Sequence, residues 1–373
     1  MSDFPVRRGR PRRAQQRPRT PTTKYQALVE ADVELHGYEL DLEELLPRIQ
    51  KEHPGLASIA LQFPDGLRDH GTQIADIVQK ATGALPVISA DPCYGACDLC
   101  DDEVAKLGIP VLIHFGHSPM PSVKTDFGVH VYYVPARSVH PIEEVVREAC
   151  KSLKGPRIGV STTAQHVHKL EAAEAILKEH GLTPVVMLGD KRTALRGQLL
   201  GCNVLAAVKA EVDEHLFIGS GDFHPLALAL ETEKKITAAN PYDGTVRTLT
   251  EAKGRILKQR WAAIGRAKEA KSFGIVVSTK GGQMRFNLAK KVLGQIQAAG
   301  KTGFIIQNKQ ISPETLLYFR HLDALVGVAC PRVPIDDQPR YKQPFLTPQE
   351  LEIVLGLRPA EQYVFDEFSA DAN

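Results

Sequence analysis

The chain has 373 residues, of which 43% are hydrophobic and 24% charged, a composition typical of globular proteins with two or three compact domains. It contains no apolar run long enough to span a bilayer, and the basic N-terminus lacks the apolar segment of a secretory signal. We therefore expect a cytoplasmic protein without a membrane span. Six cysteines are too few for a disulfide scaffold, which leaves them as free thiols, buried fillers or metal ligands.

The net charge of +2 hides a basic N-terminal tail. Residues 1–24 carry seven arginines, one lysine and one aspartate, so they contribute about +7 and the rest of the chain about −5. The tail has several prolines and few large apolar residues, so it cannot bury enough surface to offset the entropy cost of ordering. We predict a disordered tail over 1–24 with weak affinity for polyanions.

The first of three similar units follows the tail. Its apolar and amphipathic patterns predict a strand at 58–62, a helix at 68–80 and a second strand at 86–89. The loop after the second strand carries Cys97.

The second unit repeats this order of elements. A strand is predicted at 157–161, a helix at 168–179 and a second strand at 184–187. The loop that follows carries Cys202.

The third unit begins with a strand at 273–278 and a helix at 285–298. A second strand is predicted at 303–307, and a third at 325–328 leads to Cys330.

The first two units also match after their cysteines. His117 follows Cys97 by 20 residues, and His224 follows Cys202 by 22 residues. Each histidine comes shortly after an apolar strand and a glycine. This parallel indicates an internal repeat.

Short apolar strands that alternate with amphipathic helices are typical of parallel sheets with βαβ crossovers. We predict an α/β fold of three similar βαβ-based parallel-sheet domains in a pseudo-threefold arrangement. Their predicted boundaries are 25–150, 151–265 and 266–373.

One cysteine stands in an equivalent loop of each unit: Cys97, Cys202 and Cys330. Ligands of such sheets bind at the loops beyond the carboxyl ends of the strands, so the arrangement should bring the three thiols together around a central 4Fe-4S cluster. A cluster held by three thiolates has one open iron, which can chelate the amino and carboxylate groups of S-adenosylmethionine.

A second cysteine pattern competes with this interpretation. Cys93, Cys97 and Cys100 have the C-x3-C-x2-C spacing of radical S-adenosylmethionine enzymes. Those enzymes place the motif after the first strand of a barrel, whereas here a βαβ pair precedes it, and the threefold repeat would remain unexplained. We expect Cys93, Cys100 and Cys150 to be buried fillers, with Cys93 or Cys100 as spare ligands.

A series of motifs extends along the chain from about Ile59 to Glu350. The motifs include LQFPDGL at 61–67, YGACD at 94–98, GHS at 116–118, LGC at 200–202, GSGDFH at 219–224, NPY at 240–242 and ACPR at 329–332. In this order they resemble the diphthamide synthase family, the 2-(3-amino-3-carboxypropyl)histidine synthases. The three cysteines singled out above stand at the family's cluster-ligand positions, whereas Cys93 and the basic tail are not part of its pattern.

The resemblance implies a specific reaction. S-Adenosylmethionine would give its 3-amino-3-carboxypropyl group to carbon 2 of a histidine in translation elongation factor 2, leaving methylthioadenosine, in the first step of diphthamide biosynthesis. The mechanism would be radical, with an electron donor that reduces the 4Fe-4S cluster. A chain of this length resembles the archaeal form of the family, which works as a homodimer.

Nine residues in the predicted strand-end loops are candidates for binding S-adenosylmethionine: Asp65, His117, Ser118, Gln165, Asp222, His224, Tyr242, Gln283 and Arg332. Arg332 suits a bidentate grip on the substrate carboxylate, and Tyr242 suits stacking on adenine. Asp222 has a second interpretation, as the cap of a helix that begins at His224.

Other functions stay open at this point. A quinolinate-synthase-like enzyme would use the open iron as a Lewis acid for dehydration. A redox or nucleic-acid regulator would keep the cluster for structure and bind polyanions through the tail. A zinc protein would use the thiolates for zinc. None of the three would produce methylthioadenosine.

Overall fold

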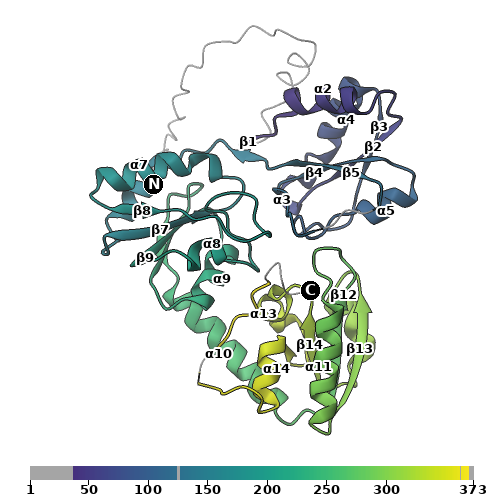
Figure 1. The fold of residues 1–373 in the computed structure, drawn as a ribbon, viewed down its shortest axis with the longest axis vertical. Helices are drawn as coiled ribbons and strands as arrows, with labels where there is room; N and C mark the ends of the chain where they lie inside the picture. Colours follow the sequence, from purple (N-terminus) through teal and green to yellow (C-terminus); the bar gives the residue numbers. More distant parts are fainter. Residues whose placement is uncertain (1–36, 124–126, 362, 369–373) are drawn as a thin grey trace, which may run out of the picture.

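The structure is a computed structural model that describes residues 37–123, 127–361 and 363–368 (Figure 1). The predicted basic tail over 1–24 lies outside these residues. Within them, no helix combines the length and the apolar character that a membrane span requires.

The first unit is a four-stranded parallel sheet in the order β3-β2-β4-β5. Its strands are β2 (Ser58–Gln62), β3 (Leu85–Ile88), β4 (Val111–Phe115) and β5 (His130–Val134). Its helices are α2 (Leu42–Glu52), α3 (Asp65–Arg68), α4 (Gly71–Thr82) and α5 (Asp101–Lys106). The single helix predicted at 68–80 is thus two helices. Helices α2 and α4 bury Leu46 and Ile74 on one face of the sheet, whereas α5 buries Val104 on the other.

The second unit has a five-stranded sheet in the order β11-β10-β9-β7-β8, in which only the edge strand β11 is antiparallel. Its strands are β7 (Arg157–Thr162), β8 (Thr183–Val185), β9 (Glu214–Ile218), β10 (Ile236–Ala239) and β11 (Val246–Thr248). Its helices are α6 (Glu143–Cys150), η1 (Val167–Lys169), α7 (Leu170–Glu179), α8 (Leu205–Val208) and α9 (Phe223–Glu231).

Helix α6 differs from its predicted place. The boundary at 150 put it in the first domain, but its apolar face packs into the core of the second sheet. Val146 and Ala149 lie there with Ile158 and Leu216. This packing moves the start of the second unit to the segment before α6, because the helix buries its apolar stripe against the chain that follows it.

The third unit is a four-stranded parallel sheet in the order β13-β12-β14-β15. Its strands are β12 (Ser272–Ser278), β13 (Thr302–Asn308), β14 (Ala324–Val328) and β15 (Phe345–Leu346). The helical segments are α10 (Thr250–Ala267), α11 (Phe286–Ala298), α12 (Pro313–Leu316), η2 (Leu317–Phe319), α13 (Arg332–Asp336), η3 (Gln338–Arg340) and α14 (Pro348–Val354).

Helix α10 connects the second and third units. The predicted boundary at 265 falls near its end, but Ala263 and Ile264 already belong to the core of the third sheet, together with Val326. Earlier in the helix, Leu257 packs against the core of the second unit. The helix is therefore shared by both units.

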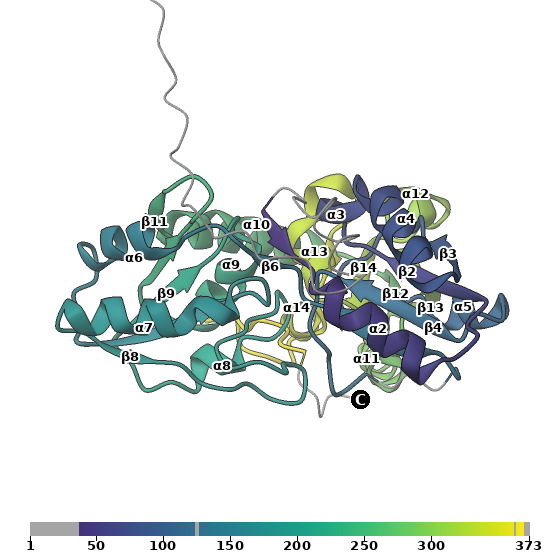
Figure 2. The same ribbon diagram turned by 90° about the horizontal axis from the view of Figure 1, so that it is seen from above.

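The three units lie at the corners of a triangle, with the second and first joined by the small antiparallel sheet of β1 (Tyr38–Glu39) and β6 (Arg137–Ser138) (Figures 1 and 2). The prediction of an α/β fold with three parallel-sheet units in a pseudo-threefold arrangement is confirmed. The arrangement leaves a central junction to which each unit contributes loops.

Candidate functional site

The central junction contains one cysteine from each unit. Cys97 precedes α5, Cys202 precedes α8, and Cys330 lies directly between β14 and α13. The pKa of the Cys97 thiol is raised to about 11, by burial first and then by the Cys202 thiol. The pKa of the Cys330 thiol is raised by burial first, then by Cys202 and Cys97. Because such an effect falls off with distance, the three thiols lie near one another at the junction.

The third unit contacts Cys97 through two hydrogen bonds, one from a glycine and one from a glutamine. The amide of Gly282 donates to the carbonyl of Cys97 at 3.1 Å. A Cβ atom at position 282 would lie 2.4 Å from the Cα of Cys97, so this approach requires glycine. The side chain of Gln283, one of the predicted site residues, donates from Nε2 to the Sγ of Cys97 at 3.4 Å.

Arg192 is a functional candidate that the sequence patterns did not identify. Its guanidinium is buried and points from Nη2 to the Sγ of Cys202 at 3.8 Å. The same group donates to the carbonyl of Gly282 at 3.4 Å. A fixed positive charge therefore lies beside the thiols at the contact of the second and third units.

The C-terminal segment 363–368 returns from the third unit to the cysteine loop of the second. The amide of Phe368 donates to the carbonyl of Cys202 at 2.8 Å. The ring of Phe368 contacts two guanidinium groups, with the guanidinium carbon of Arg192 3.9 Å and that of Arg285 4.8 Å from the ring centroid. This segment holds the loop of Cys202 against the junction, and cation–π contact strengthens the closure.

The side chain of Arg332, from the third unit, forms hydrogen bonds with the backbone of the second unit. Its Nε and Nη2 atoms each contact the carboxylate of Asp336 at 2.9 Å, and Nη1 donates to the carbonyls of Gly201, at 3.2 Å, and Phe223. The bidentate grip predicted for a substrate carboxylate is made here to Asp336. Arg332 thus fixes the backbone next to Cys202.

The two repeat-related histidines are both buried near the junction, close enough for His117 to affect the pKa of His224. Burial lowers the pKa of His117 to about 4. The pKa of His224 is lowered to about 3 by burial first, then by the charge of Arg332 and by His117. Both imidazoles are therefore neutral near pH 7. Ser118 accepts a hydrogen bond from Gln198 of the second unit at 2.7 Å, which fixes the adjoining loop.

Two further candidates lie where the first and second units meet. Gln165 donates to the carbonyl of Gly116. The hydroxyl of Tyr242 donates to Ser138 at 3.1 Å, and its ring lies 4.6 Å from the ring of His140. The aromatic face predicted to stack on adenine thus already contacts an imidazole.

Asp65 and Asp222 form ion pairs with neighbouring arginines. Asp65 contacts Arg68 at 2.9 Å with an exposed carboxylate, and Asp222 contacts Arg247 at 3.1 Å. Asp222 precedes α9, but its side chain makes no capping hydrogen bond. In the structure, each carboxylate is therefore paired with an arginine of its own unit.

The local cysteine pattern is split between two environments. Cys100 is buried in the core with Val104 and Leu112, where burial raises the pKa of its thiol to about 12. The Sγ of Cys93 lies within 4.8 Å of a ring nitrogen of His114 and of one of His117. The structure thus turns the three thiols of the C-x3-C-x2-C pattern into different surroundings.

Comparisons with known proteins identify the family of the chain. A family model described as putative diphthamide synthesis protein matches residues 63–364. The 2-(3-amino-3-carboxypropyl)histidine synthase of Pyrococcus horikoshii is 37% identical over 332 residues, covering 88% of this chain and 94% of the relative. The synthase of Methanocaldococcus jannaschii is 27% identical and covers 90% of this chain and 94% of the relative. A crystal structure of Dph2 from Pyrococcus horikoshii with a 4Fe-4S cluster has a TM-score of 0.81 and 36% identity, covering 88% of this chain and 94% of that one.

Proposed function

The chain belongs to the family of diphthamide synthesis proteins, and on that premise we propose that it transfers the 3-amino-3-carboxypropyl group of S-adenosylmethionine to carbon 2 of a histidine in translation elongation factor 2. The enzyme class is that of its curated relatives, the 2-(3-amino-3-carboxypropyl)histidine synthases. The observation that carries the proposal is the meeting of three thiols from three separate sheets at one buried centre.

Cys97, Cys202 and Cys330 would hold the 4Fe-4S cluster. The donor set fits this group, because burial raises the pKa of the Cys97 and Cys330 thiols, and a cluster would compensate the charge of their thiolates. When bound, the cluster would supply the single electron that breaks the bond between the sulfonium and the aminocarboxypropyl carbon. When the fragment adds, carbon 2 of the imidazole would lose its hydrogen as a proton and give up one electron. The buried Arg192 adds a positive charge that favours thiolates at this place.

The chain's own residues orient the reactants. Gln283 and Arg192 donate toward the sulfur atoms of Cys97 and Cys202 and thereby fix their direction. His224 stays neutral, so it can donate one hydrogen bond and accept another from the methionine part of the co-substrate. His117 is also neutral but offers only its Nε2, because its Nδ1 is already bonded to His114. Orientation decides which carbon–sulfur bond breaks, because only one of them can face the electron source.

The proposed partners are three. Translation elongation factor 2 is the protein substrate, an electron donor reduces the cluster, and a second copy of the chain forms a homodimer. A cytoplasmic location follows from a substrate that works in translation.

An anaerobic turnover assay tests the proposal. Reconstituted protein, dithionite and S-adenosylmethionine are incubated, and the nucleoside product is identified by mass spectrometry. Wild type and Cys100→Ala should form methylthioadenosine, and Cys202→Ala and Cys330→Ala should form none. Cys150→Ala, far from the junction in α6, is the control for loss of a cysteine.

Two results would contradict the proposal. Deoxyadenosine that disappears in Cys100→Ala but persists without Cys202 and Cys330 would establish the local C-x3-C-x2-C motif as the site. Absence of any nucleoside product from protein with intact cluster absorption would favour a dehydratase or a regulator.

A further inference from the structure

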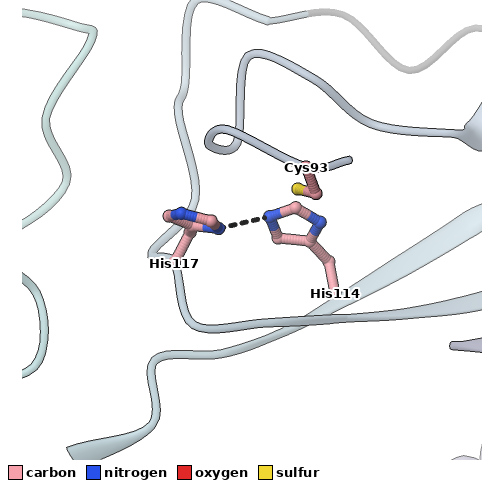
Figure 3. Close-up of side chains that lie close together, drawn as sticks. All are labelled: Cys93, His114 and His117. Atoms are coloured by element: carbon pink, nitrogen blue, oxygen red, sulfur yellow. Dashed lines mark hydrogen bonds between the residues drawn. The ribbon is translucent and has the colours of Figure 1, made fainter. Parts of the chain in front are cut away.

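A second group of soft ligand atoms lies beside the three-cysteine junction. The Sγ of Cys93 and one nitrogen each of His114 and His117 all lie within 4.8 Å of one another. Figure 3 shows the sulfur close to the ring of His114, and a hydrogen bond that joins the two imidazoles. Cys93 follows β3, His114 is on β4, and His117 follows β4, so the first unit alone supplies the group.

The orientation of His114 is fixed by a glutamine. The Nε2 of Gln62 donates to the carbonyl of Asp98 at 2.8 Å, so its Oε1 faces the Nδ1 of His114, also at 2.8 Å. The same oxygen accepts from the amide of Cys100 at 3.4 Å. An oxygen acceptor requires a proton on Nδ1, which leaves Nε2 of His114 with its lone pair. This is the arrangement of a metal-ligating histidine whose second nitrogen donates to an oxygen.

The lone pair of His114 points to the other histidine. Its Nε2 lies 3.0 Å from the Nδ1 of His117. Two imidazole nitrogens on a tetrahedral zinc are about 3.3 Å apart, given bond lengths of about 2.0–2.1 Å. A cation could replace the proton between the rings if the nitrogens separated by a few tenths of an ångström and the rings turned so that both lone pairs met at the metal.

The thiol of Cys93 has only weak partners of its own. It contacts the carbonyls of Gly95 and Asp98, each at 3.8 Å. Burial raises the pKa of the thiol well above its usual range, and a bound cation would offset that burial by stabilising the thiolate. One sulfur and two imidazoles are borderline-soft ligands, a set that suits zinc better than magnesium or calcium.

We propose that Cys93, His114 and His117 form a binding site for a thiophilic divalent cation of the zinc class, separate from the three-cysteine centre. The protein supplies three ligands, so a fourth position is left for water or a substrate group. The site would join the loops after β3 and β4, which carry Cys97 and Ser118.

Zinc and iron measured in the same sample test the proposal. Full-length protein is purified anaerobically with its cluster, equilibrated with buffered zinc chloride, freed of loose metal by dialysis and analysed by mass spectrometry of the elements. Wild type should retain about one zinc per chain in addition to its iron. Cys93→Ser and His114→Asn should lose most of the zinc, and Cys330→Ser should lose iron but keep zinc. Cys150→Ser is the matched cysteine control and should keep both metals.

X-ray absorption at the zinc edge decides the case even if the variants fold poorly. Wild-type protein should show one sulfur and two nitrogen neighbours. Three sulfur neighbours, or zinc that depends on Cys330 and not on Cys93, would place the zinc at the cluster cysteines and overturn the proposal. Wild-type protein that retains no zinc would overturn it as well.

Discussion

The guanidinium of Arg192 lies 3.8 Å from the Sγ of Cys202, and both belong to the loop between β8 and α8. Hydrogen bonds and positive charge at a ligating sulfur favour the reduced, more negative state of an iron–sulfur cluster. Arg192 is therefore placed to raise the reduction potential of the cluster that we propose here.

Replacing Arg192 by glutamine should lower this potential. We expect a shift of roughly 60 mV, which corresponds to a tenfold change in a one-electron equilibrium. A redox titration followed by electron paramagnetic resonance measures it. Arg196→Gln is the matched control, because Arg196 is on the same loop but pairs with Glu174 at the surface. Equal potentials in Arg192→Gln and wild type would show that the guanidinium does not act on the cluster.

Gly282 should tolerate no side chain. In Gly282→Ala the new Cβ would lie 2.4 Å from the Cα of Cys97, so the backbone of one loop must move. We expect a loss of about 1–3 kcal/mol in stability and weaker retention of iron. Thermal unfolding and iron analysis measure the two effects. Gly281→Ala is the control, since the nearest atom to its new Cβ would belong to Val123, at 4.0 Å. Equal iron retention in Gly281→Ala and Gly282→Ala would contradict the argument.

Much of the fold could be predicted because the strands are short apolar runs. The strand predicted at 157–161 is β7, Arg157–Thr162, and that predicted at 325–328 is β14, Ala324–Val328. The helix predicted at 68–80 was wrong in one respect, because a separate turn of helix, α3, precedes α4. The place of α6 was also missed, since an amphipathic helix between two sheets carries no sign of which sheet it covers.

Within the candidate site, the internal repeat was the main signal in the sequence. The repeat places the three cysteines in equivalent loops, but Arg192 has no counterpart in the other units and no local pattern. The contact of Phe368 with the loop of Cys202 joins residues distant in sequence, which periodicity cannot detect. The pairing of Arg332 with Asp336 did have a signal, because residues four apart on a helix are neighbours.

The buried ion pair between Arg260 and Glu350 should be essential for the third unit. Arg260 in α10 contacts the Glu350 carboxylate in α14 at 2.6 and 2.8 Å, and both side chains are fully buried. Glu350→Gln leaves the guanidinium charge without a counter-charge, at a cost of about 3–5 kcal/mol. The midpoint of urea unfolding measures it. Asp76→Asn is the control, because it removes an exposed ion pair with Lys80 and should cost at most about 1 kcal/mol. Similar costs for the two variants would show that the buried pair is not essential for the third unit.

Glu231 should make stability depend on pH in the neutral range. Burial, and then the charge of Glu367, raise the pKa of its carboxyl from 4.5 to about 7 in the folded protein. A raised pKa means that the folded state holds the proton more tightly, so this contribution to stability is complete below pH 4.5 and is lost as the pH rises through about 7.

Glu231→Gln cannot lose this proton, so the variant should gain stability relative to wild type when the pH is raised from 5 to 8. The gain should stay below about 1 kcal/mol, because the carboxyl is only partly buried and solvent screens its charge. Urea unfolding at both pH values measures it. Glu233→Gln is the control, since that side chain is 95% exposed. If the difference between Glu231→Gln and wild type were the same at pH 5 and pH 8, the carboxyl would have an ordinary pKa and α9 would pack equally well over either form.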